Sequence, residues 1–298
     1  MNANKRAFCK YCGESADDSS VEALQLYLPV NEGYINYNVV HSVMERTKCN
    51  AWRLSVAYFC NEALEPIHPL TRGGAEWEMA LKIVDRPDFI GGYAHGDEVF
   101  REIKVSLDGK AFDLRELTEL TAFGELAFEV WSVGYDPLDS CSEALLHYKR
   151  IVADESCVRV EQSVEWLNDY AVGRSYMAMM PPLKDVTDHY YTDADPIPKP
   201  LKPMSETSGN NVDAVYLCGE GGFTLGMRVE KYLSDKEKGK SFLITDNGGV
   251  PYNKMYFPLQ HKGLVNKSDV WETVTVYAIN RGVVSDDNSE RQCCQKNK

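Results

Sequence analysis

The chain has 298 residues, of which 44% are hydrophobic and 26% are charged, as in ordinary soluble globular proteins. Its formal net charge is -13 and its pI is about 5.0, which argues against nucleic acid and anionic membranes as partners. The same charge counts against a strongly anionic polysaccharide, unless a local basic patch attracts it.

Both ends of the chain are polar and lack periodicity, so residues 1–20 and 283–298 are predicted to be flexible tails. The sequence contains no signal-peptide pattern and no apolar run of membrane-spanning length. Its nine cysteines, an odd number, are therefore expected to be reduced thiols, and the expected location is the cytoplasm.

Between these tails, residues 21–282 are predicted to form one domain of short segments in which apolar and polar residues alternate. The segments are rich in Val, Ile, Tyr, Phe, Trp and Thr, which suit a pleated, half-buried surface. The predicted strands are 33–44, 51–60, 76–84, 98–107, 124–133, 145–153, 157–167, 174–180, 213–219, 223–232, 240–246, 252–259 and 271–279.

Turn signals separate several of these strands, at 107–110, 219–222 and 246–249. Residues 114–123 are predicted to supply one short helix. The fold class expected from this pattern is all-β: an antiparallel β-sandwich of jelly-roll type with long loops and at most one or two short helices.

The segment 76–84 places Glu76, Glu78 and Lys82 on one strand face, opposite the face that carries Trp77. Carboxylates two residues apart on a strand lie about 7 Å apart, since each residue rises about 3.3 Å. This spacing permits the acid and base roles of glycoside hydrolysis. An exposed acidic face is the alternative interpretation, and it is favoured.

The segment 88–110 combines a glycine-rich turn with a histidine and a well-patterned strand. If the strand has no bulge, His95, Asp97 and Arg101 share the face of Val105 and Leu107, which is expected to point inward. One interpretation is an internal network in which Asp97 pairs with Arg101. The other is a functional groove that contains these three polar groups.

Two later strands also carry polar groups at positions of interest. His147 and Lys149 share one face of 145–153, and alternation alone does not say whether that face looks inward. Gln162 interrupts an apolar series in 157–167, which indicates a buried or groove-facing amide.

Residues 185–211 are rich in proline, so they are predicted to form a long loop over one face of the sandwich. Loops of this length in compact domains are often functional lids, and Tyr190 within it is a candidate for contact with a substrate.

The last candidate site is a face of 252–259 that carries Tyr252, Lys254 and Tyr256. Aromatic rings can cover the apolar faces of sugars, while hydroxyl and ammonium groups reach sugar oxygens. A solvated strand face is the alternative interpretation of the same residues.

No cofactor and no metal are expected. The sequence lacks a P-loop, a dinucleotide-binding fingerprint, a G-x-S-x-G motif and an H-E-x-x-H motif. Cys9 and Cys12 have the spacing of half a zinc site, but the only other pair is the adjacent Cys293 and Cys294, which chelates one ion poorly.

Together, these features resemble the β-sandwich enzymes that act on carbohydrates, such as jelly-roll polysaccharide lyases. The resemblance is architectural, covers most of residues 21–280 and rests on no matching motif. It implies that His95 takes a proton next to a uronate carboxyl group, that Tyr256 protonates the leaving oxygen, and that Arg101 neutralises the carboxylate. Gln162 and Lys254 would support them.

The leading hypothesis is a cytoplasmic enzyme that acts on oligosaccharides or glycosides by β-elimination, with a carbohydrate as its partner and neither nucleic acid nor membrane. One alternative is a glycoside hydrolase that uses Glu76 and Glu78. Another is a non-catalytic module that binds a glycan or a protein. A structural component of a larger assembly is a third, and a homo-oligomer also stays open.

Overall fold

The computed structural model describes residues 5–14, 20–75, 77–233, 240–259 and 263–282. Strands dominate these residues, and the helices found there are single turns: α1 (Gly92–His95), η1 (Glu45–Thr47) and η2 (Leu114–Glu116). The predicted all-β class is therefore confirmed. The helix predicted over 114–123 shrinks to η2. No helix in the described residues is long and apolar enough to cross a membrane.

One large sheet contains most of the strands, and all of its pairings except one are antiparallel. In order across the sheet they are β15 (Lys199–Pro200), β14 (His189–Thr192), β17 (Ala214–Cys218), β18 (Phe223–Leu233), β22 (Val270–Arg281), β11 (Val158–Trp166), β10 (Asp139–Ala153), β9 (Leu126–Asp136), β6 (Glu98–Leu107), β4 (Cys49–Cys60), β3 (Gly33–Met44), β2 (Glu22–Val30), β1 (Ala7–Cys12) and β8 (Thr121–Phe123). Two short strands lie outside this order: β5 (Pro66–Pro69) pairs with β4, and β7 (Lys110–Phe112) pairs with β6.

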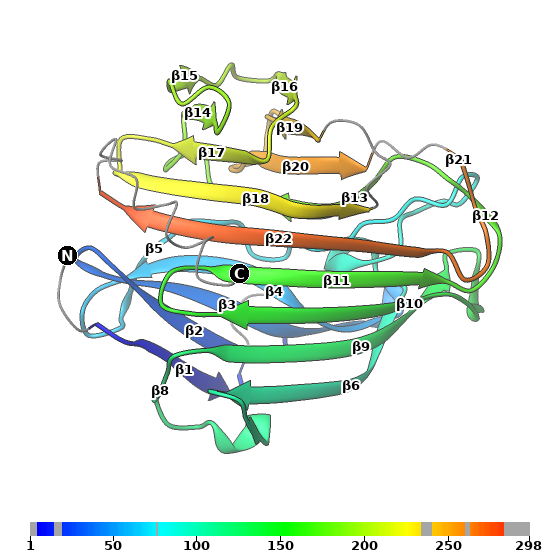
Figure 1. Ribbon diagram of the computed structural model, residues 1–298, viewed down its shortest axis with the longest axis horizontal. Helices are drawn as coiled ribbons and strands as arrows, with labels where there is room; N and C mark the ends of the chain where they lie inside the picture. Colours follow the sequence, from blue (N-terminus) through cyan, green and yellow to red (C-terminus); the bar gives the residue numbers. More distant parts are fainter. Residues whose placement is uncertain (1–4, 15–19, 76, 234–239, 260–262, 283–298) are drawn as a thin grey trace.

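The large sheet folds over on itself between β4 and β6. These two strands share a single parallel pair, Asn50 with Val99, so the sheet is barely continuous at that point. In Figure 1, the blue strands β2 and β3 consequently pass behind the green strands β9 and β10. The space between the layers holds the main hydrophobic core, to which five of the strands contribute Leu26, Leu54, Phe128, Val160 and Leu225. Full burial of each such side chain stabilises the fold by about 1.5–3 kcal/mol.

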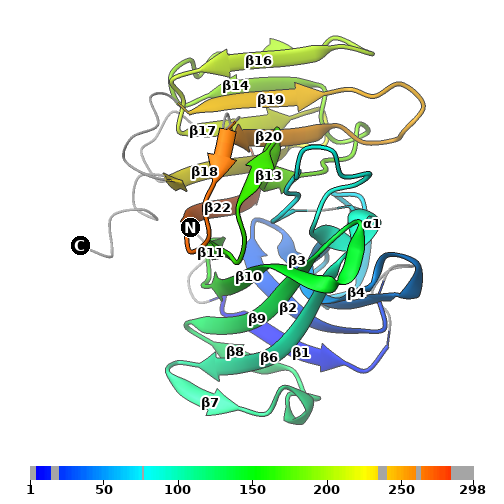
Figure 2. The same ribbon diagram turned by 90° about the vertical axis from the view of Figure 1, so that its right-hand side faces the viewer.

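A second, four-stranded sheet covers part of the first, in the order β13 (Ser175–Met180), β20 (Lys254–Leu259), β19 (Ser241–Thr245) and β16 (Glu206–Asn210). Its inner face adds Met180, Ile244 and Phe257 to the main core. A two-stranded ribbon, β12 (Tyr170–Val172) with β21 (Gly263–Val265), completes the set. Figure 2 shows α1 and the chain before it on the side of the molecule that carries β13 and β20. This arrangement positions the candidate site described below.

The strands predicted from alternation are present, most of them with shifted ends, except for 76–84. Residues 77–84 form only isolated bridges, such as Ala80 with Tyr176 and Ile83 with Val172. The prediction was wrong because this segment is covered on both sides: Trp77, Met79, Leu81 and Ile83 are buried, and so is Glu78. The acidic residue therefore does not face solvent.

The N-terminal tail prediction was wrong for residues 7–12. They form β1, which pairs with both β2 and β8, and Ala7 and Cys9 have no exposed surface. Small apolar side chains at alternate positions are sufficient to bury one face of an otherwise polar strand. The predicted C-terminal tail, 283–298, lies outside the described residues.

The proline-rich stretch 185–211 is not a single loop, because it contains β14, β15 and β16. Its four prolines are exposed, and one of them, Pro200, ends the two-residue edge strand β15. Proline donates no hydrogen bond to a sheet, so edge positions tolerate it.

Candidate functional site

A single turn of helix, α1, presents His95 beside the loop that precedes it. His95 Nδ1 lies 2.6 Å from Asp88 Oδ1, and about a quarter of the imidazole is exposed (28%). A carboxylate at Nδ1 holds the ring in one orientation and leaves Nε2 as the nitrogen available to a ligand. This is the arrangement of a general base with its positioning group.

The turn after His95 requires glycine. Gly96 has a φ of 77°, and a Cβ atom at this position would lie only 2.1 Å from the carbonyl oxygen of Thr47. Its amide donates to the carbonyl of Gly92, which closes α1. Glycine is the residue that adopts this conformation without steric cost, so Gly96 fixes the place of His95.

His95 is the first of four rings in contact, which we call the aromatic row: His95, Phe89, Tyr176 and Tyr256. The centroids of successive rings lie 4.9 Å, 6.5 Å and 4.5 Å apart. The rings come from α1, the preceding loop, β13 and β20, and all four are half-buried. Half-buried rings in a line offer a surface on which the apolar faces of sugar rings can stack.

Two cationic side chains lie beside the aromatic row, one at Phe89 and one at its Tyr256 end. Lys82 Nζ lies 5.2 Å from the Phe89 centroid and donates to the carbonyl of Arg86 at 2.7 Å. Lys254 Nζ lies 5.9 Å from the Tyr256 centroid. Burial raises the pKa of Tyr176 further above neutrality, so its phenol is a hydrogen-bond donor at neutral pH.

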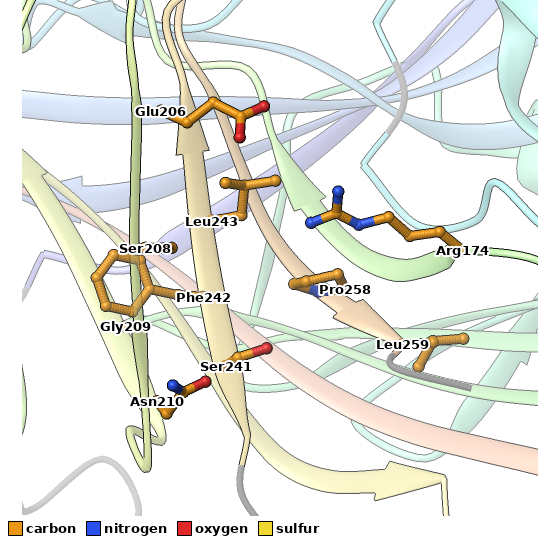
Figure 3. Close-up of a pocket in the computed structure, with 10 residues that line it drawn as sticks. All are labelled: Arg174, Glu206, Ser208, Gly209, Asn210, Ser241, Phe242, Leu243, Pro258 and Leu259. Carbon is orange, nitrogen blue, oxygen red and sulfur yellow. The ribbon is translucent and has the colours of Figure 1, made fainter. Parts of the chain in front are cut away.

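Next to the row, the outward face of the second sheet is hollowed by a cavity of about 440 Å³, which we call the outer cavity. Six of its lining residues are Arg174, Glu206, Ser208, Asn210, Leu243 and Pro258. In Figure 3, the Arg174 side chain reaches from the start of β13 toward Leu243 and Pro258, and Glu206 lies on the far side.

Strand pairing in the second sheet places residues of the aromatic row next to residues that line the outer cavity. Pro258 is the partner of Tyr176, and Leu243 is the partner of Tyr256. Arg174 and Glu206 also act electrostatically on the Tyr176 phenol. Rings, a cation, an anion and neutral polar groups therefore lie on one continuous surface.

The structure brings together some of the predicted site residues but not Arg101. His95, Lys254 and Tyr256 belong to the row and its margin. A bulge between Phe100 and Glu102 reverses the alternation of β6, so Arg101 faces solvent and pairs with Glu143. Val105 and Leu107, after the bulge, are buried as predicted, but Glu98, before it, is buried too, because one extra residue reverses the alternation between them. The predicted inward face was therefore wrong at Arg101.

Three further candidates lie near the site without lining it in the way expected. Asp97 does not pair with Arg101; it is half-buried with a φ of 54°, and burial together with the nearby Asp88 raises its pKa. Tyr252 forms an isolated bridge with Leu183 just before β20. Tyr190 lies on β14, where its ring packs against Phe242 with centroids 6.0 Å apart.

The remaining described candidates, Glu78, His147 and Gln162, are interior. Together with Glu98 and Lys149 they form a buried cluster, which we call the inner network. His147 Nδ1 lies 2.8 Å from Glu98 Oε1, and its Nε2 lies 3.2 Å from Gln162 Oε1. Lys149 Nζ lies 3.4 Å from Glu78 Oε1. Each of the five residues is at most 3% exposed, so a sugar cannot reach them in this structure.

Glu98 illustrates the chemistry of the inner network. Burial alone would raise its pKa, but His147, Lys149 and Ser132 outweigh that effect and lower the pKa to about 2. Glu78 is similarly enclosed, with Oε1 accepting from the amide of Leu54 at 2.6 Å. Glu76 lies outside the described residues. Glu78 is thus a structural group, and the predicted Glu76 and Glu78 hydrolytic pair is not supported.

Sequence reasoning missed Phe89, Tyr176, Lys82, Arg174 and Glu206. Tyr176 is the one residue among them with a visible signal, since it is an aromatic residue within a predicted strand. Among the described residues, no three His, Cys, Asp or Glu side chains cluster closely enough to hold a metal ion.

No protein-family model and no curated protein matches this sequence. Similar solved structures include the galactosidase domain of the alpha-galactosidase-sucrose kinase AgaSK, with 10% identity, a TM-score of 0.47, and coverage of 95% of this chain and 42% of that one. Galactose 1-epimerase from Lactobacillus acidophilus has 10% identity and a TM-score of 0.48, covering 94% of this chain and 100% of that one.

A third similar structure is the heparan sulfate lyase HepC from Pedobacter heparinus, with 7% identity and a TM-score of 0.49. The match covers 96% of this chain and 38% of HepC, so this chain spans less than half of that enzyme. The predicted weak resemblance to β-sandwich enzymes that act on carbohydrates agrees with these likenesses, each of which has a TM-score below 0.5. None of these proteins assigns a residue or an activity to this chain.

Proposed function

We propose that the protein binds an oligosaccharide or glycoside along the aromatic row, with one end of the ligand in the outer cavity, and that His95 acts on it as a base. The observation that carries this proposal is the contact of four half-buried rings from separate segments. They adjoin a cavity that offers charged and neutral hydrogen-bonding groups.

The outer cavity has the chemistry that recognises sugar hydroxyls. Arg174 supplies donors only, Glu206 supplies acceptors only, and Asn210 and Ser208 supply both. Leu243 provides an apolar patch in the same hollow. Concave sites of this kind use a few placed polar groups to orient a ligand and apolar surface to hold it.

β-Elimination is the reaction we favour, because it needs only one group of the His95 type. His95 Nε2 would take the proton from the ring carbon beside a uronate carboxylate. The electrons of that C–H bond would form a carbon–carbon double bond, and the neighbouring C–O bond would break with its electrons leaving on oxygen. If proton and oxygen leave from the same ring face, the imidazolium can return the proton to that oxygen.

The roles of two residues change in this proposal. Phe89 and Tyr176 lie between His95 and Tyr256, so Tyr256 serves as a stacking ring rather than as the acid. Lys82, beside Phe89, takes over from Arg101 as the cation that would neutralise the carboxylate. Lys82, Lys254 and Arg174 provide local positive charge on an acidic protein, which favours a short acidic oligosaccharide over a long polyanion.

A non-catalytic sugar-binding protein is the second candidate. The observation that favours it is the composition of the outer cavity, whose lining residues suit recognition and include no histidine. In that case, a His95→Ala variant would keep full affinity for the ligand, and the wild-type protein would turn over none of the sugars that it binds.

The test is incubation of the protein with uronate-containing and neutral oligosaccharides, followed by three readouts. Ultraviolet absorbance detects the conjugated double bond of an elimination product, reducing-end assay detects hydrolysis, and ligand-observed NMR detects binding. We expect binding and the absorbance increase with a uronate-containing sugar. Binding without any product would leave the non-catalytic function, and no binding at all would refute both candidates.

A further inference from the structure

A second cavity lies beside the seam between β4 and β6, where the large sheet folds over. None of its lining residues also lines the outer cavity. This second cavity has a volume of about 450 Å³ and is enclosed by β2, β4, β6, β7 and η2. We call it the seam cavity. This volume falls within the range of about 300–1,000 Å³ that is usual for small-molecule sites.

Glu22 lines the seam cavity and is the centre of a chain of hydrogen-bonded polar groups behind it. Tyr11 donates its hydroxyl to Glu22 Oε2, and His41 Nδ1 lies 2.8 Å from Glu22 Oε1. His41 Nε2 lies 2.6 Å from Asn50 Oδ1. The Glu22 side chain is only 14% exposed, and this remaining surface faces the cavity that it lines.

These contacts keep Glu22 charged. Burial by itself would raise the pKa of Glu22, but the contacts with Tyr11, His41 and Arg115 outweigh it and lower the pKa. Each carboxylate oxygen can accept a second hydrogen bond, so Glu22 still has capacity for a donor from a ligand.

The seam cavity is also lined by a cationic residue, Arg115. Arg115, on η2, interacts with the Tyr11 hydroxyl and is exposed. The backbone of Arg115 is held in place, because its amide donates to the side chain of Asp113, the residue that caps η2. A guanidinium at this place can bind a carboxylate through two parallel hydrogen bonds.

The other walls of the cavity are apolar. Phe100, Ile103 and Val105 line it from β6, and Phe112 lines it from β7. Phe112 is 38% exposed, so an aromatic ring at the entrance is available to a ligand. A molecule that fills this cavity therefore needs an apolar part in addition to its charged groups.

We propose that the seam cavity binds a small zwitterion with an apolar side chain, of the α-amino acid class. The ligand ammonium donates to Glu22, its carboxylate pairs with Arg115, and its side chain lies against Phe100, Ile103, Val105 and Phe112. The anionic wall, the cationic rim and the apolar walls each match one part of such a molecule. The site is separate from the aromatic row and does not depend on the proposed sugar-binding function.

Three probes that differ by one charged group test this assignment. L-Phenylalanine carries both charges, 2-phenylethylamine lacks the carboxylate, and 3-phenylpropanoate lacks the ammonium. By calorimetric titration of the full chain, we expect L-phenylalanine to bind about tenfold or more tightly than either analogue, since each lost charge-assisted hydrogen bond weakens binding. Equal affinity for the three probes, or binding of none, would overturn the proposal.

Two variants assign each preference to its residue. Arg115→Gln should abolish the preference for L-phenylalanine over 2-phenylethylamine while leaving the affinity for the amine unchanged. Glu22→Gln should abolish the preference over 3-phenylpropanoate. Arg150→Gln, an arginine on β10 that pairs with Glu161, is the matched control and should change neither.

Arg115 is exposed, so its replacement does not threaten folding, and the Arg115→Gln result stands even if Glu22→Gln fails to fold. If Arg115→Gln still preferred L-phenylalanine over 2-phenylethylamine, the proposed pairing of Arg115 with the ligand carboxylate would be contradicted.

Discussion

The Nδ1 atom of His95 and the Oδ1 atom of Asp88 lie 2.6 Å apart at one end of the aromatic row. Because Asp88 occupies Nδ1, the opposite nitrogen of the ring is the one that can meet a ligand. The loop that carries Asp88 also carries Phe89, so the same short segment positions the base and supplies a stacking surface.

Replacement of the proposed base should remove turnover but not binding. His95→Gln is expected to lower kcat about 10²- to 10⁴-fold, the usual contribution of a general base, with little change in affinity. Enzyme assays on the sugar identified by the binding screen, paired with NMR titration, measure the two effects separately.

The chain offers a matched control for this variant. His189, at the start of β14, has its Nδ1 atom 2.7 Å from Asp188 Oδ1, so it is a second histidine paired with an aspartate but outside the aromatic row. His189→Gln should leave kcat unchanged. Equal loss of activity in both variants would show that the effect of His95→Gln is indirect.

Truncation within the aromatic row should weaken binding of the sugar. Phe89→Ala is expected to lower affinity by about 5- to 10-fold, which corresponds to the loss of one ring-stacking contact of about 1 kcal/mol. Tyr148→Ala removes a half-buried ring on β10 that packs against Trp131, away from the row, and serves as the control. Calorimetric titration gives both affinities; equal losses would argue against stacking on the row.

The inner network predicts a loss of stability in acid. The pKa of Glu98 is about 2 in the folded protein, below its ordinary value of 4.5, so the unfolded chain takes up this proton first as the pH falls. The contribution of Glu98, about 3 kcal/mol, is therefore complete above pH 4.5 and disappears as the pH approaches 2.

Denaturant unfolding at a series of pH values measures this contribution. Glu98→Gln should lose the corresponding part of the acid sensitivity, while Glu102→Gln, an exposed position on the same strand, should retain it. An identical pH dependence of stability in Glu98→Gln and the wild type would contradict the prediction.

The ion pair between Lys149 and Glu78 should be costly to break from one side. Lys149 also donates to the carbonyl of Trp52 at 2.7 Å, so Glu78→Gln leaves a buried ammonium without the carboxylate that it pairs with. We expect this variant to lose about 3–5 kcal/mol of unfolding free energy, and the double variant with Lys149→Met to lose clearly less than the sum of the two single changes. Additive losses in a denaturation cycle would mean that the two groups are not coupled.

Strict alternation made most of the sheet predictable. In β11, every second residue from Val158 to Trp166 is buried, and β3 and β6 begin and end at the predicted residues. Two departures could not be predicted from this pattern. A bulge in β6 turns Arg101 outward. Residues 77–84 are covered on both sides, so Glu78 is buried together with its apolar neighbours. The alternation of polar and apolar residues indicates neither a bulge nor what packs over a segment.

The candidate site was predictable only in part for a related reason. His95 and Tyr256 were identified by residue type, but Phe89 and Tyr176 connect them through contacts between segments remote in sequence. The register of β13 with β20 decides which residues border Tyr256 and Tyr176, and no local pattern specifies that register.

The central claim is that a sugar lies across the aromatic row, and affinity measured on a double variant tests it most directly. Tyr176→Ala combined with Tyr256→Ala removes the two rings that are closest together, at 4.5 Å. We expect the oligosaccharide that binds the wild-type protein to show no detectable binding to this variant in calorimetric titration, while circular dichroism shows the same fold. Undiminished affinity in the folded double variant would contradict the claim.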